Sequence, residues 1–244
     1  MGIPFVRLAV VRYPAEAFCK NKEHCPQQYP CSHDSLKTKR SAEIAIIRNS
    51  SISSKEYFLP FTTLDPQSAL IVVDLQKGLR NIPSIHPLLG VIDRSCQLIQ
   101  AFRKQRLPVV LVNVAGTAPG RTEEPRWQRE IPADFSDLIP ELDQQQDDIL
   151  ITKRTWGAFA NTDLEAQLKA RSVTQVVLVG VATATGVEAT ARQAYEAGFN
   201  VMLVTDAMTD TRAEAHEYSL KHVFPRLGET CSSQDILLLL EKRC

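Results

Sequence analysis

The chain has 244 residues and 44% hydrophobic content, enough to bury the core of one sizeable domain with or without an extension. Lysine plus arginine and aspartate plus glutamate number 28 each, so no overall charge favours nucleic acid or an anionic membrane surface as a partner. No apolar run approaches the roughly 18 residues of a membrane span, so we expect a soluble protein with neither nucleic-acid nor membrane partners.

The first part of the chain, residues 1–61, differs in composition from the rest. It mixes charges, serines and prolines and holds only short apolar pieces. Its cysteines Cys19, Cys25 and Cys31 lack the Cys-x-x-Cys spacing of zinc modules, so we favour solvated thiols in a reducing cytoplasm over a metal cluster. We predict an N-terminal extension that need not be ordered, with an amphipathic targeting segment as the alternative, followed by one domain over residues 62–244.

From Ser68 onward, short apolar strands alternate with helical stretches. Strands are expected at residues 69–74, 108–114, 148–152, 175–180 and 200–205. Helices are expected at 88–105, 163–171, 186–197 and about 212–223, with a last one that starts at a capping box of Ser232 and Asp235. Because the strands are apolar on both faces, they belong in a covered parallel sheet, and the alternation predicts a three-layer α/β/α sandwich.

Three residues lie where such a sheet binds ligands, just beyond the carboxyl ends of its strands. Asp74 ends the first strand, Lys153 follows the third and Gly186 follows the fourth. Position 186 also begins a predicted helix, where free amide groups and the helix dipole favour an oxyanion or a thiolate. Taken singly, the aspartate would be read as a turn former and the lysine as a solvated side chain.

The motifs around these residues carry a family resemblance. Asp-x-Gln at 74–76, Lys-Arg-x-x-x-x-Phe at 153–159 and Gly-Val-Ala-Thr at 180–183 follow one another in the same order as in isochorismatase-like hydrolases. The chain resembles this cysteine hydrolase superfamily, which includes nicotinamidases, over nearly all of residues 66–242. The resemblance implies a Rossmann-like α/β/α sandwich, a cis peptide that matches Val181–Ala182, and a homo-oligomer, either a dimer or a tetramer.

The same resemblance divides the possible chemistry in two. In the amidase members the position of Gly186 is a cysteine nucleophile, and a backbone alone does not replace it. Isochorismatases resemble this chain in carrying glycine there, and they hydrolyse a vinyl ether, which needs a proton donor and water. We therefore expect isochorismate-type hydrolysis with Asp74 as general acid and Lys153 as its electrostatic partner. The alternatives are a pseudoenzyme that only binds a ligand or assembles and, less favoured, an amide hydrolase that uses activated water.

Further residues are expected to contact the substrate. Arg121 and Trp127 would supply a carboxylate clamp and a ring wall, with surface-loop residues as the alternative interpretation. No cofactor and no catalytic metal is expected, because residues 111–116 hold none of the histidines that nicotinamidases place there, and His216 and His222 are predicted to be surface or packing residues. The full set of expected substrate contacts is Gln76, Asn113, Arg121, Trp127, Phe159, Val181, Ala182 and Thr185.

Overall fold

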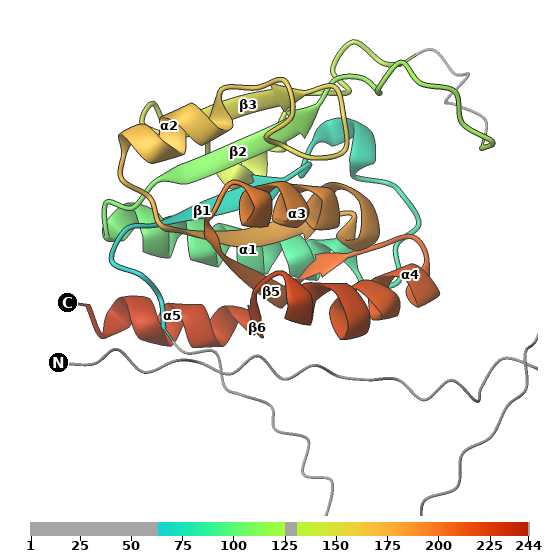
Figure 1. The fold of residues 1–244 in the computed structure, drawn as a ribbon. Coiled ribbons are helices and arrows are strands. Elements are labelled where there is room, and N and C mark those ends of the chain that lie inside the picture. The colour runs from blue at the N-terminus through green and yellow to red at the C-terminus, as the bar shows by residue number, and fades with distance from the viewer. Residues whose placement is uncertain (1–62, 125–130, 244) are drawn as a thin grey trace, which may run out of the picture. The chain divides into compact units, whose positions relative to one another are not determined.

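The computed structural model describes residues 63–124 and 131–243, so the predicted extension and Trp127 lie outside the described residues. Within them, six parallel strands form one sheet in the order β3-β2-β1-β4-β5-β6 (Figure 1). The strands are β1 (Ser68–Val73), β2 (Val109–Val114), β3 (Ile149–Lys153), β4 (Gln175–Val181), β5 (Asn200–Thr209) and β6 (Glu229–Cys231).

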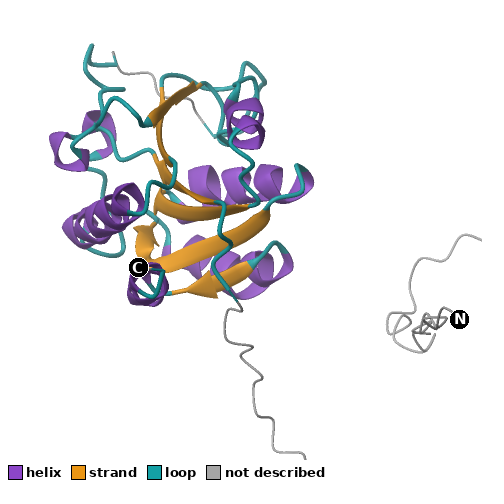
Figure 2. Cartoon of the chain, turned by 90° about the vertical axis from the view of Figure 1, so that its left-hand side faces the viewer, coloured by secondary structure: helices purple, strands orange, loops and turns teal. Residues whose placement is uncertain are grey.

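Helices cover both faces of this sheet, as Figure 2 shows from the side. The helices are α1 (Leu88–Lys104), α2 (Leu164–Ala170), α3 (Glu188–Glu196), α4 (Ala213–Tyr218) and α5 (Ser233–Glu241). Buried residues of α1 and α5 form one core cluster, and buried residues of α2 and α3 form the other. The predicted three-layer α/β/α fold is confirmed.

The two central strands explain why the carboxyl edge of the sheet is rigid. Every residue of β1 and β4 is buried. Leu70 and Val72 pack toward α1 and α5, whereas Ile71 and Val73 pack toward α2 and α3. Strands that are apolar on both faces are stable only when both faces are covered, so this packing fixes the ends of β1 and β4, where Asp74 and Val181 lie.

The structure corrects several expected boundaries. β5 continues to Thr209, past the predicted end at 205, and β6 was not expected because three residues give too short a pattern. The stretch expected as one helix over 212–223 is divided into α4 and a π-helical turn at Ser219–Val223. The capping box at Ser232 is present, and the boundary near residue 62 stays a prediction.

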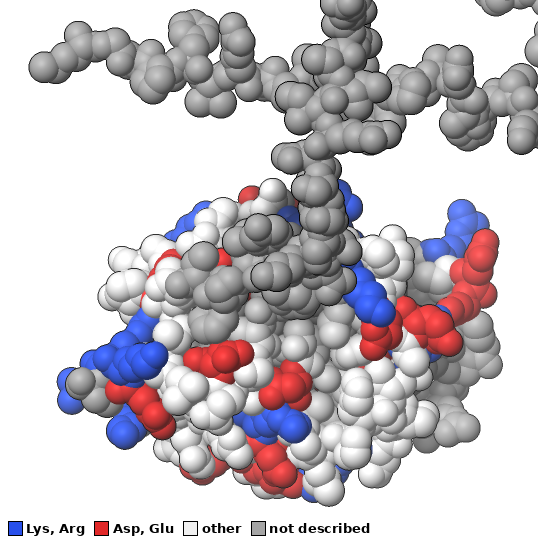
Figure 3. Space-filling model, turned by 90° about the horizontal axis from the view of Figure 1, so that it is seen from below, with Lys and Arg blue, Asp and Glu red and all other residues white. Residues whose placement is uncertain are grey.

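The face seen in Figure 3 carries charges of both signs. Basic and acidic side chains are interspersed on the part of the face that grey atoms leave visible in Figure 3. None of the helices in 63–124 and 131–243 has the length and hydropathy to cross a membrane.

Gly180 combines a positive φ with a position that has no room for a side chain. Its φ is +114°, and a Cβ there would lie 2.1 Å from the carbonyl oxygen of Val73. Gly198 is a matched control, because its φ is +84° but a Cβ would meet nothing within 4 Å. We expect Gly180→Ala to lower the free energy of unfolding by about 3 kcal/mol or more, and Gly198→Ala by about 1 kcal/mol. Urea denaturation measures both, and equal losses would contradict the backbone contact.

Candidate active site

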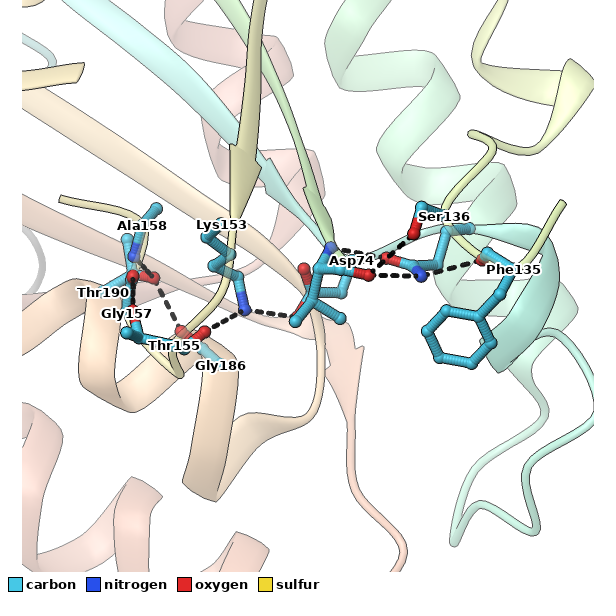
Figure 4. Close-up of polar contacts among 11 residues, drawn as sticks. Asp74, Phe135, Ser136, Lys153, Thr155, Gly157, Ala158, Gly186 and Thr190 are labelled. Carbon is cyan, nitrogen blue, oxygen red and sulfur yellow. Dashed lines mark hydrogen bonds and ion pairs between the residues drawn. The ribbon is translucent and has the colours of Figure 1, made fainter. Parts of the chain in front are cut away.

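The centre of the candidate site is a buried ion pair between Asp74 and Lys153. Lys153 Nζ donates to Asp74 Oδ2 at 2.7 Å, and the two side chains are 2% and 7% exposed respectively. Lys153 Nζ also lies 3.3 Å from the carbonyl oxygen of Thr155, so the ammonium group bridges β3 and the residue after β1 (Figure 4). The two residues that the sequence placed at the carboxyl ends of strands are therefore in direct contact, although β2 lies between β1 and β3 in the sheet.

An unusual backbone conformation brings the carboxylate to the lysine. Val73 packs toward α2 and α3, so a regular strand would turn the next side chain to the opposite face. Lys153 is on the α2 and α3 side, two residues after Ile151 of the same cluster. Asp74 has φ +55°, a left-handed conformation that aspartate tolerates better than most residues. This turn ends the strand alternation and lets the carboxylate meet Lys153.

The environment of Asp74 shifts the pKa of its carboxyl group upward, toward neutral pH. Burial raises the pKa of Asp74 to about 6, against the opposing charge and hydrogen bond of Lys153. Oδ1 is buried and has no hydrogen-bond partner among the described residues, whereas Oδ2 accepts from the lysine. One oxygen of the carboxyl group is thus free to hold a proton.

The turn after β4 places Gly186 against this carboxyl group. Val181–Ala182 is a cis peptide, as the family resemblance implies, and a π-helical turn at Thr183–Val187 leads into α3. A Cβ at position 186 would lie 3.0 Å from Asp74 Oδ2 and 3.0 Å from the carbonyl oxygen of Val181. A side chain at this position would therefore project directly beside the carboxylate, where glycine leaves only backbone.

Hydrogen bonds join the turn to the segment after β3. Thr190 Oγ1 donates to the carbonyl oxygen of Gly186 at 2.7 Å and accepts from the amide of Ala158 at 3.1 Å (Figure 4). Ala158 lies in the motif that begins with Lys153. The elements that carry Lys153 and Gly186 are consequently held at a fixed distance by a buried threonine that sequence reasoning did not identify.

Gln76 and Asn113 act on the other side of Asp74 by holding a loop in place. The Gln76 amide donates to the carbonyl oxygens of Val114 and Phe135 at 3.0 and 2.8 Å and accepts from the Val114 amide at 2.8 Å. Asn113 Nδ2 donates to the carbonyl oxygen of Ser136 at 2.6 Å. Both side chains bind backbone, so in this structure they support the site from outside rather than point into open space.

The remaining expected contacts fall into different places. Val181 lines a hollow beside Asp74, and Ala182 and Thr185 are half-buried in the turn. Phe159 instead packs on Phe199, with ring centroids 5.9 Å apart, in the core under α2 and α3. Arg121 is exposed in the loop after β2. The structure thus places Val181 beside Asp74, whereas the half-buried ring of Phe159 packs on Phe199.

A small hollow adjoins Asp74 on the α1 side. Its volume is about 180 Å³, including space open to solvent. Leu79, Leu88 and Ile92 give it an apolar wall, and Arg80, which also lines it, pairs with Glu141 at 2.5 Å. None of these four lining residues was expected from the sequence to lie at the site, although a helix was predicted to begin at residue 88. The hollow places an apolar surface next to the carboxyl group of Asp74.

No cysteine of the described segments takes the place of the missing thiol. Cys96 Sγ lies on α1 and contacts the carbonyl oxygen of Glu141 at 3.1 Å. Cys231 lies in β6, where burial raises its pKa to about 12. A thiol in either environment is protonated near neutral pH and is a poor nucleophile.

Comparison with known proteins agrees with the fold and the motifs. A family model described as the isochorismatase domain matches residues 68–235. The isochorismatase family protein YwoC of Bacillus subtilis is 38% identical over 178 residues, which cover 70% of this chain and 93% of YwoC. Nicotinamidase 3 of Arabidopsis thaliana is 30% identical over 173 residues, which cover 65% of this chain and 83% of Nicotinamidase 3. The solved structure of an isochorismatase family protein from Burkholderia thailandensis has a TM-score of 0.71 at 36% identity, covering 74% of this chain and 99% of the other.

A cysteine introduced at position 186 tests the geometry of the turn. The thiol of Gly186→Cys would sit beside Asp74 at the start of a helical segment, where thiolates are stabilised. We expect iodoacetamide to modify it at pH 7 about tenfold faster than free cysteine. Mass spectrometry of the peptide that contains residue 186 gives the rate, with the buried Cys231 as a slow internal control. A rate no faster than that of free cysteine would contradict this placement of residue 186.

Proposed function

Since the chain belongs to the isochorismatase family, we propose that it is a hydrolase that cleaves a small enol ether of the isochorismate type without a cysteine nucleophile. One observation carries the proposal. The position beside the Asp74 carboxyl where a nucleophilic side chain would project is occupied by Gly186, while Asp74 and Lys153 form an intact buried pair.

Enol-ether hydrolysis fits this set of groups because it needs an acid and water but no protein nucleophile. Asp74 Oδ1 transfers its proton to the terminal carbon of the enol ether, and the electrons of the carbon–carbon double bond form the new C–H bond. Water then adds to the resulting oxocarbenium carbon and loses a proton. The hemiketal that forms collapses to a keto acid and an alcohol, so that one water molecule is consumed for each ether bond broken.

Lys153 has a role that changes during this reaction. Before proton transfer, its charge lowers the pKa of Asp74 and works against protonation. After transfer, Asp74 is a buried carboxylate, and the ammonium group at 2.7 Å stabilises the new negative charge without any rearrangement. The lysine therefore favours the product side of the proton transfer and also keeps the acid oriented.

The pH dependence of the rate follows from the same pair. With a pKa of about 6, Asp74 is mostly protonated below that value and mostly ionised above it. A general acid works only in its protonated form, so kcat/KM should fall about tenfold for each pH unit above 6. This alkaline limb belongs to Asp74 and should be absent from any residual activity of Asp74→Asn.

The decisive experiment compares two classes of substrate. Purified protein is incubated with isochorismate, with release of pyruvate as the readout, and with nicotinamide and other small amides, with release of ammonia as the readout. We expect pyruvate from isochorismate and no ammonia. Asp74→Asn should reduce turnover by about a hundredfold or more, because the amide keeps the shape but cannot donate the proton. Asp147→Asn, which changes an exposed carboxylate, is the matched control.

Three results would count against the proposal. Ammonia release from an amide at about 1 per second or faster would favour an amide hydrolase that activates water. Equal turnover of isochorismate by the wild type and Asp74→Asn would remove Asp74 from the mechanism. Binding of isochorismate without any turnover would instead favour a protein that has kept the pocket and lost the reaction.

A further inference from the structure

A second group of polar side chains holds the Gly186 turn at residues 183 and 184. His216, on α4, is buried, and its Nδ1 lies 2.8 Å from Thr183 Oγ1, which is also buried. Asp210 Oδ2 accepts a hydrogen bond from the amide of Ala184 at 2.8 Å. Thr183 and Ala184 are the first two residues of the π-helical turn that ends at Val187. The turn beside the reacting carboxyl is therefore fastened at two adjacent positions by residues outside the proposed chemistry.

The buried histidine has an exposed histidine as its neighbour. His86, in the loop before α1, meets the His216 ring edge-on, with centroids 5.1 Å apart. His86 itself is held at Thr209, whose Oγ1 accepts from the His86 amide at 3.2 Å and lies 3.4 Å from its Nδ1. The two rings thus connect the exposed surface to the buried Thr183. A positive charge on one ring disfavours protonation of the other.

We propose that His216 is a positioning residue for the active site: in its neutral form it holds Thr183 and with it the Gly186 turn, and on protonation it releases the turn, so that the two histidines make the site sensitive to acid. The effect on the turn stands by itself. The effect on turnover rests on the proposed function.

The charges around His216 support this direction. Burial lowers the pKa of His216, and the neighbouring His86 lowers it further, while Glu217 and Asp210 act in the opposite direction. The folded protein consequently binds this proton more weakly than the unfolded chain does. Stability from His216 is complete above the ordinary value of 6.5 and is lost as the pH falls below it. A proton on His216 therefore works against the folded arrangement, in which the ring is buried beside Thr183.

Protonation of the histidine pair and protonation of Asp74 then have opposite effects on activity. Asp74 gains its proton as the pH falls through about 6, whereas His216 keeps the turn closed only while it is neutral. Activity should show two limbs, an alkaline one set by Asp74 and an acid one set by His216. A residue that served only to stabilise the fold would not move one limb and leave the other.

Hydrogen exchange of the full-length protein tests the effect on the turn without any substrate. His216→Leu and Thr183→Val remove the contact, and we expect exchange of the amides of residues 183–187 to rise about tenfold at pH 7, with the amides of β4 unchanged. His216→Asn can place an amide where Nδ1 was and should stay within about threefold of the wild type. His222→Asn is the matched control, because His222 is exposed and its ring meets only Tyr218 among the described ring contacts.

The same measurement as a function of pH tests the switch. After correction for intrinsic exchange, wild-type opening of residues 183–187 should increase between pH 7 and pH 5, and His216→Asn should remove this dependence. With an active substrate, His216→Asn should move the acid limb and leave the alkaline limb in place.

Three outcomes would overturn the inference: unchanged exchange in both His216→Leu and Thr183→Val, a rise that includes β4 equally, or a pH dependence that persists in His216→Asn. If no enol ether is turned over, the exchange results still show whether His216 holds the turn. Failure of the proposed function can therefore be told apart from failure of this inference.

Discussion

The buried contact between Asp74 and Lys153 is the interaction on which the rest of the site depends. Removing two charged groups from water is costly, and the cost is offset only where the pair is well oriented and its remaining polar atoms are bonded. Here one carboxyl oxygen has the lysine and the other has no partner in the described chain. Burial raises the pKa of Asp74 to about 6 in spite of Lys153, so a protonated fraction persists near neutral pH, and the protonated form is what general acid catalysis requires.

The surrounding structure keeps the Asp74–Lys153 ion pair in place. The positive φ of Asp74 and the close approach of Gly180 to Val73 fix the end of β1 against β4. Thr190 connects the turn of Gly186 to the segment after Lys153, and Gln76 fastens the loop at Phe135. Thr190 and Gln76 bond to backbone, so the reacting side chains are held by parts of the chain that have little freedom to move. Such a rigid surround preserves the orientation that makes the acid useful.

The sequence was sufficient for the layers and for the proximity of Asp74, Lys153 and Gly186, because strands rich in Val, Ile and Leu have strong patterns and their carboxyl ends meet at one edge. It did not predict the ring of Phe159 packing on Phe199, since the direction of a side chain in a loop depends on tertiary contacts. It also read His216 as packing or surface, while its partner Thr183 lies 33 residues away. The left-handed backbone at Asp74 has no signal in a single sequence, because aspartate at a strand end is equally common in ordinary turns.

The most direct test is the titration of Asp74 itself, followed through the ¹³C signal of its labelled carboxyl group and assigned with Asp74→Asn. The account requires a midpoint of about 6, because burial outweighs the effect of Lys153. In Lys153→Met the midpoint should rise further, since the opposing positive charge is gone. A wild-type midpoint at or below the ordinary value of 3.8 would mean that Asp74 is fully ionised at neutral pH, and the acid role would be contradicted.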